Sequence, residues 1–452
     1  MPAASAGAAG ASRYLKSIRT DSARLLVFLR DMPKGGDLHS HLGGAVYAES
    51  MIRWAATDGL CLLVTTYSLV PPPCDANYGR VPAALISQNT DLNRNVIDAW
   101  SMRSFDFSRG IGHDHFFQSF GKFGLATNRH FGDMLAEVAS RAATDHVSYL
   151  ELMQTLDGGI AASLGTRAGF RTDFAAMRGT LLSAGLRDSL AGVRRAIDAA
   201  EAKRNAVEHC GTANAEAGCA VTIRYLYQVL RGLPPEIVFA QILTGFELGR
   251  LDSRVVGFNL VMPEDDLVPM RDFSLHMAMI DFLRKEYPDV HISLHAGELV
   301  PSLVPSDGLT FHIRESIDKG HAERIGHGVD VLHERGADDL IKMMAARHIL
   351  VEIALTSNDG ILGVRGTEHP LATYLRYGVP VALATDDQGV SRSDMTREYL
   401  RAVLDQHLDY ATLRAMARNS LAYSFAEREV KIRLLREFDA AMARFEGKWG
   451  KN

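Results

Sequence analysis

Short apolar segments rich in β-branched residues recur along this chain, and longer stretches with helical periodicity separate them. This alternation is typical of βαβ units, in which helices connect parallel strands. Eight segments are predicted as strands: residues 36–42, 147–153, 237–243, 255–261, 291–295, 324–327, 349–354 and 379–385. Eight parallel strands that alternate with helices predict an α/β fold, the (β/α)₈ TIM barrel, whose active site lies at the carboxyl ends of the strands.

The chain is longer than such a barrel requires, with 452 residues against a minimum of about 250. The surplus falls in two predicted helical insertions, residues 43–146 after the first strand and residues 155–235 after the second. Residues 1–12 are rich in Ala and Gly and lack the charged and then apolar layout of a signal peptide, so a flexible tail is predicted there. No repeat or low-complexity linker divides residues 13–452, which are interpreted as a single domain.

The composition argues against two classes of partner. The formal net charge is −5, whereas nucleic-acid-binding proteins usually gather Lys and Arg on one face. No run of about 18 consecutive apolar residues is present, so no membrane-spanning helix is predicted. The expected partner is therefore a small molecule, with no nucleic acid and no membrane.

Four cysteines occur as two local pairs, Cys61 with Cys74 and Cys210 with Cys219. Each pair closes a loop short enough for a disulfide bond, which would indicate an oxidising compartment such as the periplasm or the exterior. Four free thiols in a cytoplasmic protein are the alternative interpretation. None of the four lies in a CxxC pattern, so a cysteine-based zinc site is not expected.

The first predicted strand ends in the sequence DLHSHL, which contains His39 and His41. Side chains two residues apart on a strand point to the same side, so these residues can present two imidazoles to one point. An HxH pattern alone is weak evidence, because His113 and His115 form a second one in the same chain. For that second pair, in a predicted loop, we expect a structural role.

Three further motifs stand at predicted strand ends. The fifth strand leads into SLHAGE, which adds His295 as a third imidazole and Glu298 beyond a small Ala-Gly step. The sixth strand carries His327 between two glycines. The eighth ends in the adjacent carboxylates of Asp386 and Asp387, whose mutual repulsion a metal ion would relieve. Randomly scattered polar motifs would not all fall at strand ends, so together these motifs predict one site.

Three histidines and an aspartate with one open position suit a zinc ion that carries a water molecule. The predicted ligands of one Zn²⁺ per chain are His39, His41, His295 and Asp386. Zinc lowers the pKa of its water toward about 7. Glu298 is the candidate proton donor, because a sheltered carboxyl near an electron-rich ring has a raised pKa. His327 is a candidate to deprotonate or orient the water, and Asp387 to form a hydrogen bond with a heterocycle.

These motifs together resemble the adenosine deaminase family within the amidohydrolase superfamily, over about residues 33–425. The resemblance is carried by PKG at 33–35 with HSHL at 39–42, SLHAGE at 293–298, GHG at 326–328, TSN at 356–358, HPL at 369–371 and TDD at 385–387. It implies the same four zinc ligands in a metal-dependent hydrolase. It also implies that Glu298 protonates a purine at N1, that His327 holds and activates the water attacking C6, and that Asp387 meets N7. The implied reaction converts adenosine or 2′-deoxyadenosine to the inosine compound and ammonia.

Three departures from the family pattern concern the substrate. Gly43 stands where the family commonly has an acidic residue for the sugar hydroxyl. Met262 and Pro263 replace a glycine whose backbone approaches the purine, and Gln388 replaces a proline. Asp387, Gly43 and Met262 are thus the predicted substrate-binding positions. Deamination of another 6-aminopurine or aminated heterocycle stays open as an alternative, as does a catalytically silent binding protein on the same barrel.

The long insertions and residues 255–260 resemble the secreted, growth-factor-like branch of the family. That likeness implies a homodimer formed through an added helical segment. Together with the cysteine pairs it favours a periplasmic or secreted protein, with the cytoplasm as the alternative.

Overall fold

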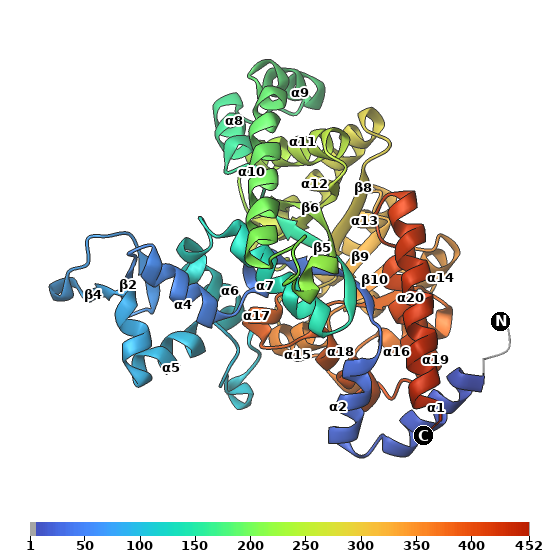
Figure 1. Ribbon diagram of the computed structural model, residues 1–452. Coiled ribbons are helices and arrows are strands. Elements are labelled where there is room, and N and C mark those ends of the chain that lie inside the picture. Colours follow the sequence, from blue (N-terminus) through green and yellow to red (C-terminus); the bar gives the residue numbers. More distant parts are fainter. Residues whose placement is uncertain (1–5, 452) are drawn as a thin grey trace.

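The computed structural model describes residues 6–451 and confirms the TIM barrel (Figure 1). Eight parallel strands form one sheet in the order β1-β5-β6-β7-β8-β9-β10-β11, which is also their order along the chain. Their bounds are β1 Gly35–His41, β5 Val147–Gln154, β6 Thr222–Leu230, β7 Val255–Val261, β8 His291–Ala296, β9 Arg324–His327, β10 Leu350–Ile353 and β11 Val381–Leu383. An isolated bridge between Ser40 and Asp386 joins the two ends of the sheet.

Helices follow the strands and surround the barrel, because most of them expose a polar side and pack an apolar side on the sheet. Those outside the two insertions are α1 Ala6–Ile18, α2 Ser22–Asp31, α11 Pro235–Leu251, α12 Leu267–Glu286, α13 His312–Asp318, α14 Ala337–Ala346, α15 Leu355–Leu362, α16 Leu371–Tyr377, α17 Gln388–Ser391, α18 Met395–Leu404, α19 Tyr410–Ala422 and α20 Arg428–Trp449. Within the described residues, no helix is both long and apolar enough to cross a bilayer.

The insertion between β1 and β5 projects to one side of the barrel (Figure 1). Its helices are α3 Leu42–Ala45, α4 Ala48–Thr57, α5 Thr90–Ala99, α6 His113–Phe123 and α7 Phe131–Thr144. It also contains an antiparallel sheet of β2 Cys61–Leu63, β3 Ser68–Val70 and β4 Arg80–Pro82, in the order β3-β2-β4. This small sheet was not predicted, because strands of three residues are too short for a period of two to be recognised.

One predicted strand is wrong. Residues 237–243 belong to α11, and the third barrel strand is β6, Thr222–Leu230. Helix α11 carries proline in its first turn and buries every residue from Val238 to Leu248, so its apolar run imitates a buried strand. The insertion after β5, which contains α8 Ile160–Ala168, α9 Phe174–Ser183 and α10 Leu186–Val207, therefore ends at residue 221 and not at 235.

The predicted flexible tail is also corrected for the residues that the structure describes. Residues 6–12 begin helix α1, while residues 1–5 of the predicted tail lie outside the described part of the chain. Helix α1 buries Ala8, Ala11 and Leu15, and it lies beside α20 near the end of the chain (Figure 1). A Cβ at Gly10 would lie 2.2 Å from the carbonyl oxygen of Gly450. Small residues thus allow two helices to approach closely, a use of Ala and Gly that composition alone does not separate from flexibility.

Both cysteine pairs are disulfides. Cys61 and Cys74 have Cα atoms 5.4 Å apart, and Cys210 and Cys219 have Cα atoms 5.5 Å apart. The first bond joins β2 of the small antiparallel sheet to the loop after β3, and the second closes the loop after α10. Each bond thus constrains an insertion and not the barrel itself.

The barrel interior contains a row of buried charges beneath the strand ends. Arg324 on β9 forms ion pairs with Glu151 on β5, at 2.6 Å, and with Glu352 on β10, at 2.7 Å. The Tyr149 hydroxyl donates to Glu151 at 2.7 Å. All three charged residues are at most 1% exposed, so each depends on its partner to offset the cost of burial.

Arg324→Met is expected to lower the free energy of unfolding by about 3–5 kcal/mol, because it leaves two buried carboxylates without their cation. Urea unfolding followed by circular dichroism measures the change. The control is Arg433→Met, which breaks an exposed pair with Glu437 and is expected to cost less than about 1 kcal/mol. Equal losses in the two variants would show that the interior pair has no special importance.

Candidate metal and catalytic centre

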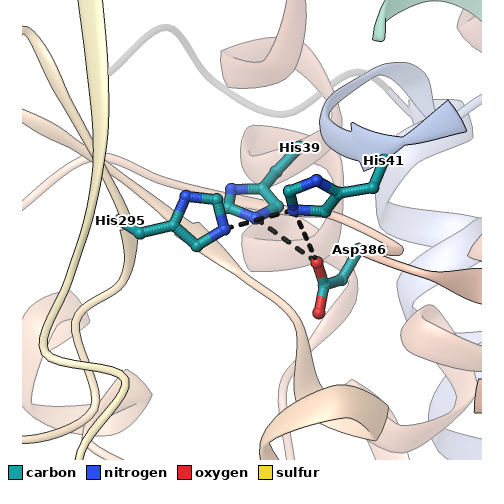
Figure 2. A group of neighbouring side chains, drawn as sticks. All are labelled: His39, His41, His295 and Asp386. Atoms are coloured by element: carbon teal, nitrogen blue, oxygen red, sulfur yellow. Dashed lines mark hydrogen bonds and ion pairs between the residues drawn. The ribbon is translucent and has the colours of Figure 1, made fainter. Parts of the chain in front are cut away.

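Strand ends bring four metal-ligand side chains together at the carboxyl end of the barrel (Figure 2). His39 and His41 come from β1, His295 from β8, and Asp386 follows β11. Their ligand atoms all lie within 4.8 Å of one another. The Nε2 atoms of His41 and His295 are 3.2 Å apart, and Asp386 Oδ1 lies 3.5 Å from Nε2 of His39 and 3.3 Å from Nε2 of His41. The structure therefore assembles all four of the predicted ligands.

Each of the three imidazoles is oriented by a hydrogen bond at its other nitrogen. The Nδ1 atoms donate to Glu352 Oε2 from His39 at 2.7 Å, to Gln228 Oε1 from His41 at 3.1 Å, and to Asn259 Oδ1 from His295 at 2.8 Å. These bonds fix the tautomer of each ring and leave the Nε2 lone pair facing the common centre. Such outer partners are typical of histidines that bind a metal ion.

Asp386 is held in the site by both its backbone and its side chain. Its φ of 55° lies in the left-handed region, where a non-glycine residue is uncommon. The Ser357 hydroxyl donates to Oδ2 at 2.6 Å, which leaves Oδ1 facing the imidazoles. A strained backbone at a strand end is a frequent feature of functional sites.

A metal ion fits this set of residues. His39 Nε2 is buried and has no hydrogen-bond partner among the described residues. Burial lowers the pKa of His39, but the nearby carboxylates of Asp386 and Glu352 outweigh it and raise the pKa to about 10. The negative potential that favours a proton on this ring equally favours a cation between the ligands. Three imidazole nitrogens and one carboxylate oxygen are a donor set suited to a divalent metal ion.

The three residues predicted to handle protons and substrate lie at the same centre. The Nε2 atom of His327 is 3.6 Å from Oε1 of Glu298. Each of the three contributes a buried polar atom that has no hydrogen-bond partner among the described residues: Glu298 Oε1, His327 Nε2 and Asp387 Oδ1. Burial, with the charge of Asp386 added, raises the pKa of both Glu298 and Asp387 well above the ordinary range. Both carboxyl groups therefore favour their protonated form.

Glu264, which the sequence analysis did not identify, fixes the turn that carries Glu298. Its two carboxylate oxygens accept hydrogen bonds from the backbone amides of Gly297, at 3.0 Å, and Glu298, at 2.9 Å. His312 Nδ1 donates to the same carboxylate at 2.5 Å. Burial raises the pKa of Glu264, but the hydrogen bond and charge of His312, the charge of Arg231 and the Gly297 amide outweigh it and lower the pKa to about 2.

The two remaining predicted substrate positions lie near the centre but differ in their surroundings. A Cβ at Gly43 would meet no atom within 4 Å, whereas a Cβ at Gly44 would lie 1.7 Å from Asp387 Oδ1. Met262 directly follows β7 with a φ of 88°, and its carbonyl oxygen accepts hydrogen bonds from Arg231 at 3.1 and 3.2 Å. The contact of Met262 with a substrate stays a prediction.

The second HxH pair is structural, as predicted. His113 Nε2 forms a hydrogen bond with Asp265 at 2.9 Å. His115 Nε2 donates to the carbonyl oxygens of Asp98 and Ser101 at 3.1 and 2.9 Å. Both residues lie on helix α6 and not in the predicted loop, and neither belongs to the metal-ligand cluster.

The orienting residues were missed by the sequence analysis for different reasons. Glu352 carries a detectable signal, because it is a lone carboxylate inside an apolar strand. Gln228 lies on β6, the strand that was placed incorrectly. Asn358, whose Nδ2 lies 2.9 Å from His327 Nδ1, and His369, which contacts Asn358, lie in motifs noticed only for their resemblance to the family.

A family model described as adenosine deaminase matches residues 189–441 of this chain, a range that contains His295, Glu298, His327, Asp386 and Asp387. An adenosine deaminase from Shewanella pealeana is 28% identical over 235 residues, which cover 51% of this chain and 64% of the relative. An adenosine deaminase from Escherichia coli is 36% identical over 152 residues, 33% of this chain and 42% of the relative. The chain thus matches less than two thirds of the length of these relatives.

Solved structures with the same fold include three whose chains are covered almost completely. The N6-methyl-AMP deaminase of Arabidopsis thaliana has a TM-score of 0.60 and 21% identity, with 93% of this chain and 99% of that chain covered. The adenine deaminase of Arthrobacter aurescens has a TM-score of 0.57 and 18% identity, with 90% of this chain and 98% of that chain covered. An amidohydrolase from Burkholderia ambifaria with bound zinc has a TM-score of 0.56 and 14% identity, with 94% of this chain and 95% of that chain covered. These likenesses show the shared fold.

Glu352→Gln is expected to lower metal affinity by about 10–100-fold, because His39 loses a charged acceptor at Nδ1. Metal content after dialysis against graded chelator, on protein shown to be folded by circular dichroism, measures the effect. Glu247→Gln is the matched control, since Glu247 also pairs with an arginine, Arg187, but lies outside the site. Unchanged metal retention in Glu352→Gln would contradict the orienting role.

Glu264 is expected to stabilise the fold in a pH-dependent way. Its pKa of about 2 lies below the ordinary value, so its stabilisation is present above about pH 4.5 and is lost as the pH falls toward 2. The advantage of the wild type over Glu264→Gln in unfolding free energy should therefore shrink by about 2 kcal/mol between about pH 5 and pH 3.

Glu334 is the matched control for this measurement. It also accepts hydrogen bonds from two consecutive backbone amides, those of Ile313 and Arg314, but burial raises its pKa to about 7. The stabilisation from its protonated form is lost as the pH rises, so Glu334→Gln should show the opposite trend over the same interval. The same trend in both variants would refute the assignment for Glu264.

Proposed function

This chain belongs to the adenosine deaminase family, and from that premise we propose that it is a zinc-dependent enzyme that removes the 6-amino group of a purine by hydrolysis. Adenosine and 2′-deoxyadenosine are the leading candidate substrates, and inosine or 2′-deoxyinosine and ammonia the products. The observation that carries the proposal is the position of three unpartnered polar atoms, on Glu298, His327 and Asp387, beside the four metal-ligand residues.

Zinc is the metal that the donor set favours, since three imidazoles and one carboxylate with an open position are typical of catalytic zinc. The residues that would hold one ion per chain are His39, His41, His295 and Asp386. When bound, zinc supplies a Lewis acid that lowers the pKa of a water molecule toward about 7. The relative from Burkholderia ambifaria, which has zinc bound on the same fold, supports this choice.

Glu298 is proposed as the proton donor to ring atom N1. Burial and the charge of Asp386 raise the pKa of Glu298, and this favours the protonated form, which is the form needed to donate. Protonation at N1 draws electrons from C6 and prepares that atom for attack by water. Of the two water protons, one becomes the third hydrogen of the departing ammonia and the other returns to Glu298. The carboxyl group is thereby restored, and the atoms balance.

Asp387 and His327 are proposed to fix the two reactants. Burial and the charge of Asp386 also favour protonated Asp387, so it can donate a hydrogen bond to N7 of the purine. His327 faces the same space from β9 and holds the attacking water. A purine bound between Glu298 and Asp387 places C6 next to this water, which converts a bimolecular reaction into one between positioned partners.

The substituent on the purine is the least constrained part of the proposal. The family's acidic residue for the sugar hydroxyl is absent at Gly43, and the position is open space. Relatives with this fold bear the names adenine deaminase and N6-methyl-AMP deaminase. Adenine and 6-amino- or 6-methylamino-purine nucleotides are therefore the second candidate substrates.

A silent binding protein on the same barrel is disfavoured by the composition of the site. Binding alone needs neither four metal ligands nor a buried carboxyl group held beside them, because burying these groups costs stability unless they interact with a ligand. The same cost of burial disfavours a site that uses only some of the metal ligands and buried carboxyl groups.

The first experiment is a substrate panel with metal analysis. Purified protein is expected to hold about one zinc per chain and to shift the ultraviolet spectrum of adenosine from the adenine to the hypoxanthine type. Adenine, AMP, N6-methyl-AMP and 2′-deoxyadenosine are tested in parallel. Turnover of a nucleotide or of adenine in preference to adenosine would select the second candidate, and zinc without turnover of any of them would overturn the proposal.

Glu298→Gln tests the proton donor within the same assay. The variant is expected to keep its zinc and to lose about 10²–10⁴-fold in kcat, because the amide has no proton of suitable acidity to donate. Asp386→Ala, in contrast, is expected to lose zinc and activity together. Near-normal turnover by Glu298→Gln would refute the role of Glu298.

A further inference from the structure

Two motifs at the edge of the centre have no role in the proposed reaction. They contain Asn358 on α15 and His369, just before α16. Both side chains are buried, and neither belongs to the metal-ligand cluster. They form a chain of three hydrogen bonds that begins at a backbone amide and ends at His327.

All three contacts have lengths within hydrogen-bond range. The backbone N–H of Leu371 lies 3.1 Å from His369 Nδ1. His369 Nε2 lies 3.1 Å from Asn358 Oδ1, and Asn358 Nδ2 lies 2.9 Å from His327 Nδ1. The last ring then presents Nε2 to the space beside Glu298, where it has no partner in the described chain.

The direction of every link follows from the first one. A backbone N–H can only donate, so His369 Nδ1 accepts and the ring proton of neutral His369 lies on Nε2. This proton is donated to Asn358 Oδ1, and the amide group Nδ2 is left to donate to His327 Nδ1. His327 Nδ1 is therefore an acceptor, and the proton of its neutral ring lies on Nε2.

The Leu371 N–H also excludes the arrangement in which the Asn358 amide is turned over. If the Asn358 amide were turned over, its Nδ2 would donate to His369 Nε2, and the His369 proton would move to Nδ1. Two N–H groups, those of Leu371 and His369, would then face each other at 3.1 Å. Burial also lowers the pKa of His369 to about 3, so the ring is neutral and has a single proton to place.

We propose that Asn358 and His369 are positioning residues that fix His327 as the Nε2–H tautomer, so that His327 donates a hydrogen bond to the attacking water and does not take a proton from it. This inference rests on the proposed deamination. It resolves the two roles that the sequence left open for His327, since a neutral ring that already carries its proton on Nε2 cannot accept another there without becoming a buried cation. Proton transfer is left to Glu298, as in the balanced reaction above.

The test is Asn358→Asp, which keeps the shape of the side chain and replaces the donor by an acceptor. The carboxylate still accepts from His369 Nε2, but it now requires a proton on His327 Nδ1. Histidine-labelled ¹⁵N NMR, with the His327 signals assigned by their loss in His327→Gln, is expected to show a change from the Nε2–H to the Nδ1–H pattern. A fall in kcat of about 10²–10⁴-fold is expected, with KM changed less than about threefold and metal content unchanged.

Two further isosteric changes are the controls. Asn259→Asp retains an acceptor for His295 Nδ1, so its NMR spectrum is expected to keep the tautomer of His295. Asn419→Asp removes an amide donor to the Val381 carbonyl, outside the site, and is expected to keep kcat within about twofold.

A second variant, Asn358→Leu, removes the donor without adding a charge. It is expected to show both tautomers of His327 in the NMR spectrum and a smaller fall in kcat than Asn358→Asp. If His327 stays Nε2–H in both variants, the positioning role is overturned, whatever happens to turnover. If the wild type turns over none of the 6-aminopurines, the proposed function fails. The NMR spectra still decide whether the hydrogen bonds of Asn358 and His369 set the tautomer of His327.

Discussion

Two backbone hydrogen bonds at Asp386 join the last strand end of the barrel to the first. The amide of Asp386 donates to the carbonyl of His39 at 2.9 Å, and the amide of His41 donates to the carbonyl of Asp386 at 3.1 Å. The same contact closes the sheet and brings the carboxylate of Asp386 against the imidazoles of β1. Because all eight strands are parallel, every strand end lies on one rim, and the centre forms wherever polar residues end a strand. The contact that closes the barrel thus also assembles the site.

Beneath that rim, buried charged residues in the barrel interior orient one of the metal-ligand side chains. Arg324 pairs with Glu352, and Glu352 accepts the Nδ1 proton of His39, so a ligand ring is connected to a guanidinium on the neighbouring strand. An apolar interior would fold at a lower desolvation cost, since burying an ion pair offers little net stability. What the charged row adds is a fixed orientation for His39, and its cost is tolerated because every member has a partner.

Local sequence signals predicted most of the barrel and most of the centre, and they failed where tertiary packing overrides them. Seven of the predicted strands coincide with observed strands because buried parallel strands are continuous apolar runs. The prediction for residues 237–243 failed because α11 is buried on all sides. His39, His295 and Asp386 could be found since each ends a strand, whereas Glu264 could not, because its partners Gly297 and Glu298 approach it only through the folding of separate loops. The direction of the hydrogen bonds around Asn358 could not be predicted, because it depends on the contact between the Leu371 amide and His369 in the folded structure. No residue pattern states which way a side-chain amide faces.

Gly43 and Gly44 are neighbours with opposite freedom to vary. A side chain at position 44 would collide with Asp387, while one at position 43 would enter open space. Selection on preference for different purines can therefore act at position 43 by single substitutions with little penalty in folding, and at position 44 it cannot act without losing the carboxyl group beside it. A rigid catalytic wall next to one adaptable position is an arrangement from which related enzymes with different substrates can diverge while their chemistry stays the same.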